Sequence, residues 1–127
     1  PPRSTLFPYT TLFRSDPVPQ VYIPFTQGQR LAVCTSGEPK VIEVREVPGH
    51  NPGSVLFYCE ALKVAFTGDA IFRESIGRTD FPGGDYSLLL KSIREQVLTL
   101  PDETTLLPGH GPESSVAHEK RFNPYLA

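Results

Sequence analysis

Residues 40–69 read KVIEVREVPGHNPGSVLFYCEALKVAFTGD and are the most informative part of the chain. Three runs rich in Val, Ile, Phe and Tyr, at 40–47, 54–59 and 63–67, are typical of β-strands. The first two runs are separated by residues 48–53, where two prolines and two glycines in six residues exclude regular structure. We therefore predict neighbouring strands joined by a loop that carries a histidine.

On either side of this stretch the pattern predicts further elements. Upstream, a strand is expected at 30–34. Downstream, residues 73–84 hold three glycines and one proline and are predicted to form a long loop. A helix capped by Asp85 should run to about Thr99, because its apolar residues recur at spacings of four, four and three. Those residues are Leu89, Ile93, Val97 and Leu100. A strand at 104–107 and a short helix at 116–122, capped by Ser115, complete a layered α/β domain.

Composition limits the kind of protein. The chain has 127 residues, of which 39% are hydrophobic and 20% charged, enough for one domain with a core. A net charge of −2 argues against nucleic acid as a partner, and no apolar run approaches the ~20 residues of a membrane-spanning helix. The only cysteines, Cys34 and Cys59, lie in strand-like runs, so we interpret both as core residues rather than disulfide partners or nucleophiles. We expect a cytoplasmic protein.

The N-terminal segment is unusual, because Thr-Leu-Phe occurs twice within residues 1–15. The segment lacks the charged and apolar regions of a signal peptide. It resembles the conceptual translation of a common sequencing adapter. We therefore expect residues 1–15 to be a disordered artefact; the alternative is a genuine aromatic-rich arm.

Three polar residues share one sequence context. His50, Asp69 and His110 each follow glycine at the predicted end of a strand or in the loop beyond it. Glycine lets the backbone turn sharply and brings such side chains to a defined point. Two imidazoles and a carboxylate suit zinc or a similar transition metal. They are far apart in sequence, so the fold would have to assemble the site.

Several sequence blocks together resemble the metallo-β-lactamase superfamily. The blocks are 46–54, 66–69 and 107–111. A further block at 75–85, together with Glu119 and residues 123–125, is similar to small hydrolases of the glyoxalase II (hydroxyacylglutathione hydrolase) type.

The resemblance implies an αββα sandwich with two metal ions between its layers. Zinc is expected, with iron or manganese as alternatives. His50 would bind the first ion and His110 the second. Asp69 would bridge both ions and position a metal-bound hydroxide. The substrate would be a small-molecule thioester such as S-lactoylglutathione.

The sequence departs from the family at one important point. Complete members carry a His-x-His-x-Asp-His motif, and no histidine precedes His50 here. We therefore expect residues 16–127 to be a truncated domain that corresponds to the C-terminal half of the sandwich. Each ion would have two protein ligands, where catalytic zinc usually has three. Weak metal binding, negligible hydrolysis and an exposed apolar face are expected of the chain itself.

Other interpretations remain open. The chain could derive from a persulfide dioxygenase-like enzyme with one iron, or be a non-catalytic fragment with residual metal affinity. Arg78 and Asp80 could pair to fix their loop, or Asp80 could orient a metal-bound histidine. His118 is expected on an exposed helix face beside Glu119, with substrate contact as the alternative, and Phe72 is expected to pack in the core or against a loop.

Overall fold

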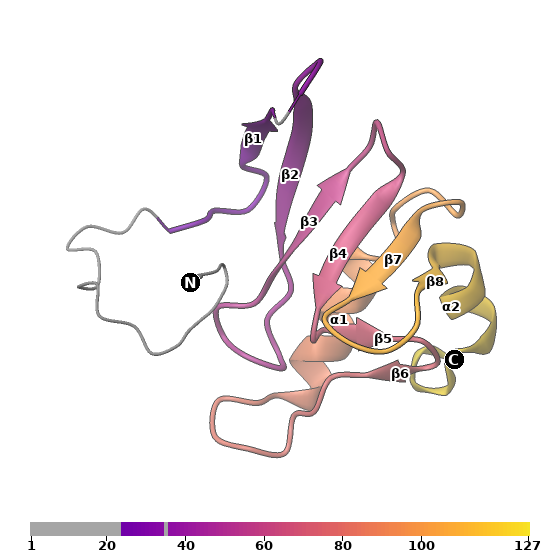
Figure 1. Ribbon diagram of the computed structural model, residues 1–127. Helices are drawn as coiled ribbons and strands as arrows, with labels where there is room; N and C mark the ends of the chain where they lie inside the picture. Colours follow the sequence, from indigo (N-terminus) through magenta and orange to yellow (C-terminus); the bar gives the residue numbers. More distant parts are fainter. Residues whose placement is uncertain (1–23, 35) are drawn as a thin grey trace, which may run out of the picture.

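The computed structural model describes residues 24–34 and 36–127; the predicted artefact at 1–15 lies outside them. The described residues form a six-stranded sheet with the order β1-β2-β3-β4-β7-β8 (Figure 1). Its strands are β1 (Arg30–Val33), β2 (Lys40–Glu46), β3 (Val55–Cys59), β4 (Val64–Gly68), β7 (Thr105–Pro108) and β8 (Ser114–Ser115). Neighbouring strands are antiparallel except β4 and β7, which run parallel. The predicted α/β class is therefore confirmed.

Helices cover one face of this sheet (Figure 1). They are α1 (Tyr86–Gln96), α2 (Val116–Phe122) and the short 3₁₀ helix η1 (Pro124–Leu126). The predicted apolar stripe of α1 is buried in a core shared with Leu56, Ala65 and Leu106. Both predicted caps are present, since Asp85 accepts a hydrogen bond from the Leu88 amide and Ser115 from the His118 amide. Within the described ranges, no helix combines the length and apolarity needed to cross a bilayer.

The other face of the sheet carries apolar side chains in register. Val44 lies opposite Phe57, Phe57 opposite Phe66, and Phe66 opposite Leu107, so these side chains share one face. Phe66 is 45% exposed, and the rings of Phe25 and Phe57 pack against each other at a steep angle. The expected exposed apolar face is therefore present in part, because Phe66 is exposed whereas Val44 on the same face is fully buried.

Two expectations about local structure are wrong. The predicted loop at 73–84 contains a strand, because β5 (Ile71–Phe72) and β6 (Ser75–Ile76) form a separate hairpin. Its turn lacks glycine and proline, and Glu74 adopts a left-handed φ of 60° there. Cys34 is exposed, because β1 is an edge strand that ends at Val33, whereas Cys59 is buried as expected.

Candidate metal centre

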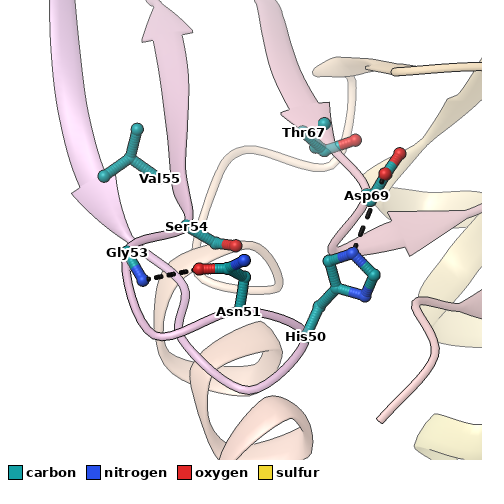
Figure 2. Close-up of a pocket in the computed structure, with 8 residues that line it drawn as sticks. His50, Asn51, Gly53, Ser54, Val55, Thr67 and Asp69 are labelled. Carbon is teal, nitrogen blue, oxygen red and sulfur yellow. Dashed lines mark hydrogen bonds and ion pairs between the residues drawn. The ribbon is translucent and has the colours of Figure 1, made fainter. Parts of the chain in front are cut away.

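The fold brings the three predicted ligands to one edge of the sheet. Because β4 and β7 are parallel, Asp69 and His110 both follow carboxyl ends that lie side by side. His50 reaches the same place from the loop between β2 and β3 (Figure 2). The Nε2 atom of His50 lies 3.8 Å from Oδ2 of Asp69, and Nδ1 of His110 lies 3.5 Å from Oδ1. Each carboxylate oxygen therefore faces a different imidazole.

The orientation of His50 is fixed by its surroundings. Its Nδ1–H donates a 2.8 Å hydrogen bond to the backbone carbonyl of Arg78, so that the Nε2 atom faces Asp69. The Phe81 ring packs edge-on against the imidazole, with 5.3 Å between ring centroids. With Nδ1 engaged by this carbonyl, Nε2 is the ring nitrogen that faces the site and could bind a metal ion.

The loop that carries His50 is seated on helix α1. The Pro48 carbonyl accepts a 2.8 Å hydrogen bond from the Ser92 hydroxyl, and the Gly49 carbonyl accepts one of 2.7 Å from the Asp85 amide. These contacts join the loop to the first turns of a helix whose other face is in the core. The position of His50 therefore depends on the packing of α1.

An open groove with a volume of about 350 Å³ runs beside His50 and Asp69 (Figure 2). Its other lining residues are Asn51, Gly53, Ser54, Val55, Thr67 and Gly68. The side-chain oxygen Oδ1 of Asn51 accepts a hydrogen bond from the backbone amide of Gly53, which fixes the Asn51 side chain in the groove wall. Sequence reasoning did not single out Asn51 or Ser54, although both flank the histidine in the quoted stretch.

The side chains of His50, Asp69 and His110 are of the types that bind divalent metal ions, but they are too few to hold two ions. A carboxylate between two imidazoles is a suitable bridge for zinc or iron. However, among residues 24–34 and 36–127 no group of three or more His, Cys, Asp or Glu side chains is spaced to hold an ion. With Asp69 shared, two ions would each have two protein donors. These residues therefore fit part of a two-metal site.

Comparison with known proteins identifies the family. A model of the metallo-beta-lactamase superfamily matches residues 12–110. The chain belongs to this superfamily. Hydroxyacylglutathione hydrolase GloC of Haemophilus influenzae is 49% identical over 84 residues, which are 66% of this chain and 40% of GloC. The chain thus spans about 40% of the length of this relative.

Solved structures of the superfamily share the fold. The crystal structure of BLEG-1 B3 metallo-beta-lactamase matches 80% of this chain and 47% of its own, with a TM-score of 0.72 and 43% identity. The structure of TTHA1623 in a di-iron-bound form matches 85% of this chain and 50% of its own, with a TM-score of 0.73 and 41% identity. The family resemblance is therefore confirmed, and the chain is related to metallo-hydrolases.

In this superfamily member, the side chains of Arg78 and Asp80 contact each other. Arg78 Nε donates a 3.0 Å hydrogen bond to Asp80 Oδ1, and both side chains are largely exposed. The group that contacts His50 is the Arg78 carbonyl rather than the Asp80 carboxylate. These contacts are the ones that the loop-fixing interpretation of Arg78 and Asp80 expects, and we keep that interpretation as a prediction.

The Arg78–Asp80 pair predicts a measurable titration effect. The Arg78 guanidinium hydrogen-bonds the Asp80 carboxylate and holds its pKa below the ordinary value. Because the folded-state pKa of Asp80 is lowered, the pair stabilises the folded loop at pH values above the unfolded-state pKa of Asp80. This stabilisation is lost as the pH falls through the folded-state pKa. Replacing Arg78→Gln should raise the pKa of Asp80, measured by NMR titration, toward its ordinary value, while a backbone hydrogen bond to the carboxylate keeps part of the lowering. Lys91→Gln, which removes an exposed charge from α1, should leave it low; an unchanged pKa in Arg78→Gln would contradict the pair.

The expectation of an exposed face at His118 and Glu119 is wrong. Glu119 is completely buried, and His118 is partly buried with its Nε2 2.8 Å from Oε2 of Glu74. Helix α2 packs against β8 and reaches the turn of the β5–β6 hairpin, which covers this side of the helix. The sequence gives no periodic signal for this contact because α2 has only seven residues.

Proposed function

We propose that the protein represented by this chain is a metal-dependent hydrolase that cleaves a small thioester of the S-lactoylglutathione class. The observation that supports it most directly is the Asp69 carboxylate between His50 and His110, with one oxygen toward each imidazole. The groove beside these residues offers room for an acyl group. Similarity to GloC favours a thioester over other acyl substrates.

Each residue has a defined part in this proposal. Asp69 would hold two ions in common, with His50 on one side and His110 on the other. The Arg78 carbonyl keeps Nε2 of His50 directed at the site by accepting its Nδ1–H. When bound, the ions would supply Lewis-acid activation of water and of the acyl carbonyl. Zinc is our first choice, and the di-iron form of TTHA1623 supports iron as the alternative.

The chain by itself is proposed to bind metal weakly and to have negligible activity. Two protein donors per ion are fewer than the three that usually hold catalytic zinc. Both cysteines are free thiols, in keeping with the reducing cytoplasm that we propose as its location.

The function can be tested in a chimera in which residues 24–127 replace the matching part of GloC. We expect the zinc- or iron-loaded chimera to hydrolyse S-lactoylglutathione. Asp69→Ala should reduce this activity at least about 100-fold, because even groups behind the ligands contribute about 10–100-fold. Asp102→Asn is the matched control, because Asp102 forms an exposed pair with Lys120 and precedes β7, whereas His110 follows that strand.

Other outcomes would contradict the proposal. A folded, metal-loaded chimera that cleaves a cephalosporin but no thioester would favour a β-lactamase. Oxygen consumption with glutathione persulfide would favour the dioxygenase. Full activity in Asp69→Ala would exclude the assigned site.

A further inference from the structure

The β5–β6 hairpin connects the candidate metal centre to helix α2 (Figure 1). Its first strand begins two residues after Asp69, and the Phe72 ring packs on the imidazole of His110 with 4.6 Å between centroids and a 39° tilt. His110 itself is otherwise exposed, with 75% of its side chain accessible. In the described structure the Phe72 ring is therefore a principal constraint on where this imidazole lies.

The turn of the hairpin is held by the segment that follows His110. The Glu74 amide donates a 2.9 Å hydrogen bond to Oε1 of Glu119, and Glu74 Oε2 pairs with Nε2 of His118. Asn123 Nδ2 donates to the Ser75 carbonyl at 3.0 Å. The left-handed φ of 60° at Glu74 belongs to the same turn. A left-handed φ is strained in a non-glycine residue, so this turn needs such external contacts to persist.

Glu119 is the residue on which these contacts converge. Its carboxylate is completely buried, and Oε1 accepts hydrogen bonds from both the Glu74 amide and Asn123 Nδ2. Oε2 accepts a hydrogen bond from the Ser114 hydroxyl, which lies at the end of the His110 loop. A buried carboxylate is costly unless it is well hydrogen-bonded, so the three donors and the carboxylate depend on one another. One side chain thus ties both the hairpin that carries Phe72 and the chain that follows His110.

We propose that Glu119 is a positioning residue that sets the place of the His110 imidazole relative to Asp69. It acts through Phe72 on one side and through Ser114 on the other, and touches no substrate. The importance of this position for catalysis rests on the proposed metal role of His110. The positioning of His110 by Glu119 does not depend on that metal role, and it can be measured in the absence of metal.

The experiment compares Glu119→Ala with Glu119→Gln in the metal-free chain. Glutamine keeps one oxygen for Glu74 and Asn123, and its amide can donate to the Ser114 hydroxyl. The readout is the ring-current shift that Phe72 imposes on the His110 ring protons, recorded above about pH 8, where an ordinary imidazole is neutral. Phe72→Leu defines complete loss of that shift. We expect Glu119→Ala to lose most of the shift and Glu119→Gln to retain most of it.

Controls separate positioning from unfolding. Lys120→Ala removes an exposed pair with Asp102 from the same helix and should leave the His110 shift unchanged. If Glu119→Ala does not fold, Ser114→Ala, which removes a single donor, replaces it and should reduce the shift in a folded chain. An unchanged His110 shift in a folded Glu119→Ala or Ser114→Ala chain would overturn the proposal.

A second measurement distinguishes this proposal from the function proposed above. In the GloC chimera, Glu119→Ala should lower zinc affinity about 10–100-fold and change the visible spectrum of the cobalt-substituted site, while Glu119→Gln restores both. If the His110 shift is lost but metal affinity and spectrum stay unchanged, Glu119 positions His110 and the metal role of His110 fails. If neither changes, the positioning proposal fails by itself.

Discussion

The substitution Gly77→Ala, which adds a single methyl group, is expected to disrupt the candidate metal centre. A Cβ atom at this position would overlap the backbone carbonyl oxygen of Asp69 and lie 3.2 Å from Nδ1 of His50. The carbonyl oxygen cannot withdraw alone, because the Gly77 amide is hydrogen-bonded to the Ala70 carbonyl next to it. Either Asp69 or the strand β6 must shift. We expect a loss of about 2 kcal/mol in unfolding free energy, in the range typical of overpacking.

The functional consequence of Gly77→Ala should be larger than its effect on stability. If Asp69 has the proposed bridging role, its misplacement by about 1 Å should cost on the order of 100-fold in rate, and the GloC chimera allows that rate to be measured. Gly28→Ala is the control, because Gly28 lies outside the groove, in the turn before β1, and nothing lies within 4 Å of an added Cβ there. Equal activity in Gly77→Ala and Gly28→Ala would show that the close approach to Asp69 does not exist in solution.

Replacing Gly49→Ala is expected to destabilise the chain by about 3 kcal/mol, the sum of backbone strain and steric overlap. Gly49 has a φ of 136°, which side chains with a Cβ rarely adopt. The added Cβ would also overlap the backbone and Cβ of Leu89, a fully buried residue of α1. Because domains are stable by only about 5–15 kcal/mol, such a loss is a large fraction of the total. Urea denaturation measures it.

The two contributions at Gly49 can be separated with Gly28→Ala. Gly28 has a φ of 80° and nothing within 4 Å of an added Cβ, so its replacement reports the strain of a positive φ without overlap. We expect Gly28→Ala to cost about 1 kcal/mol. If both variants lose the same free energy, the packing of the His50 loop against α1 contributes nothing.

Much of the fold could be predicted from the sequence because its signals are local. The caps at Asp85 and Ser115 and the apolar stripe of α1 depend on residues within a few turns. The β5–β6 hairpin could not be predicted, because contacts with Glu119 stabilise its turn and no residue of the turn itself indicates one. Cys34 was misassigned because an apolar run does not reveal whether its strand lies at the edge of a sheet.

The candidate site shows a similar division. The glycine contexts of His50, Asp69 and His110 identified the residues that the fold brings together. The partners that hold them are a backbone carbonyl and two aromatic rings, at Arg78, Phe81 and Phe72. Every residue has a backbone carbonyl, so the sequence does not indicate which carbonyl binds the histidine. The sequence also does not distinguish an aromatic side chain that packs on a histidine from one that packs in the core. Those positions became visible only in three dimensions.

The parallel pairing of β4 with β7 has a consequence for folding kinetics. Strands β1 to β4 can pair successively through short turns, each closing a small loop. The β4–β7 pair closes only after the chain has passed through the β5–β6 hairpin and helix α1, so its closure entropy is the largest in the sheet. Asp69 and His110 meet across that junction. The candidate metal centre therefore lies at the strand pair with the highest contact order in the sheet. A mutation that slows the closure of this pair should delay assembly of the site, while strands β1 to β4 remain free to pair.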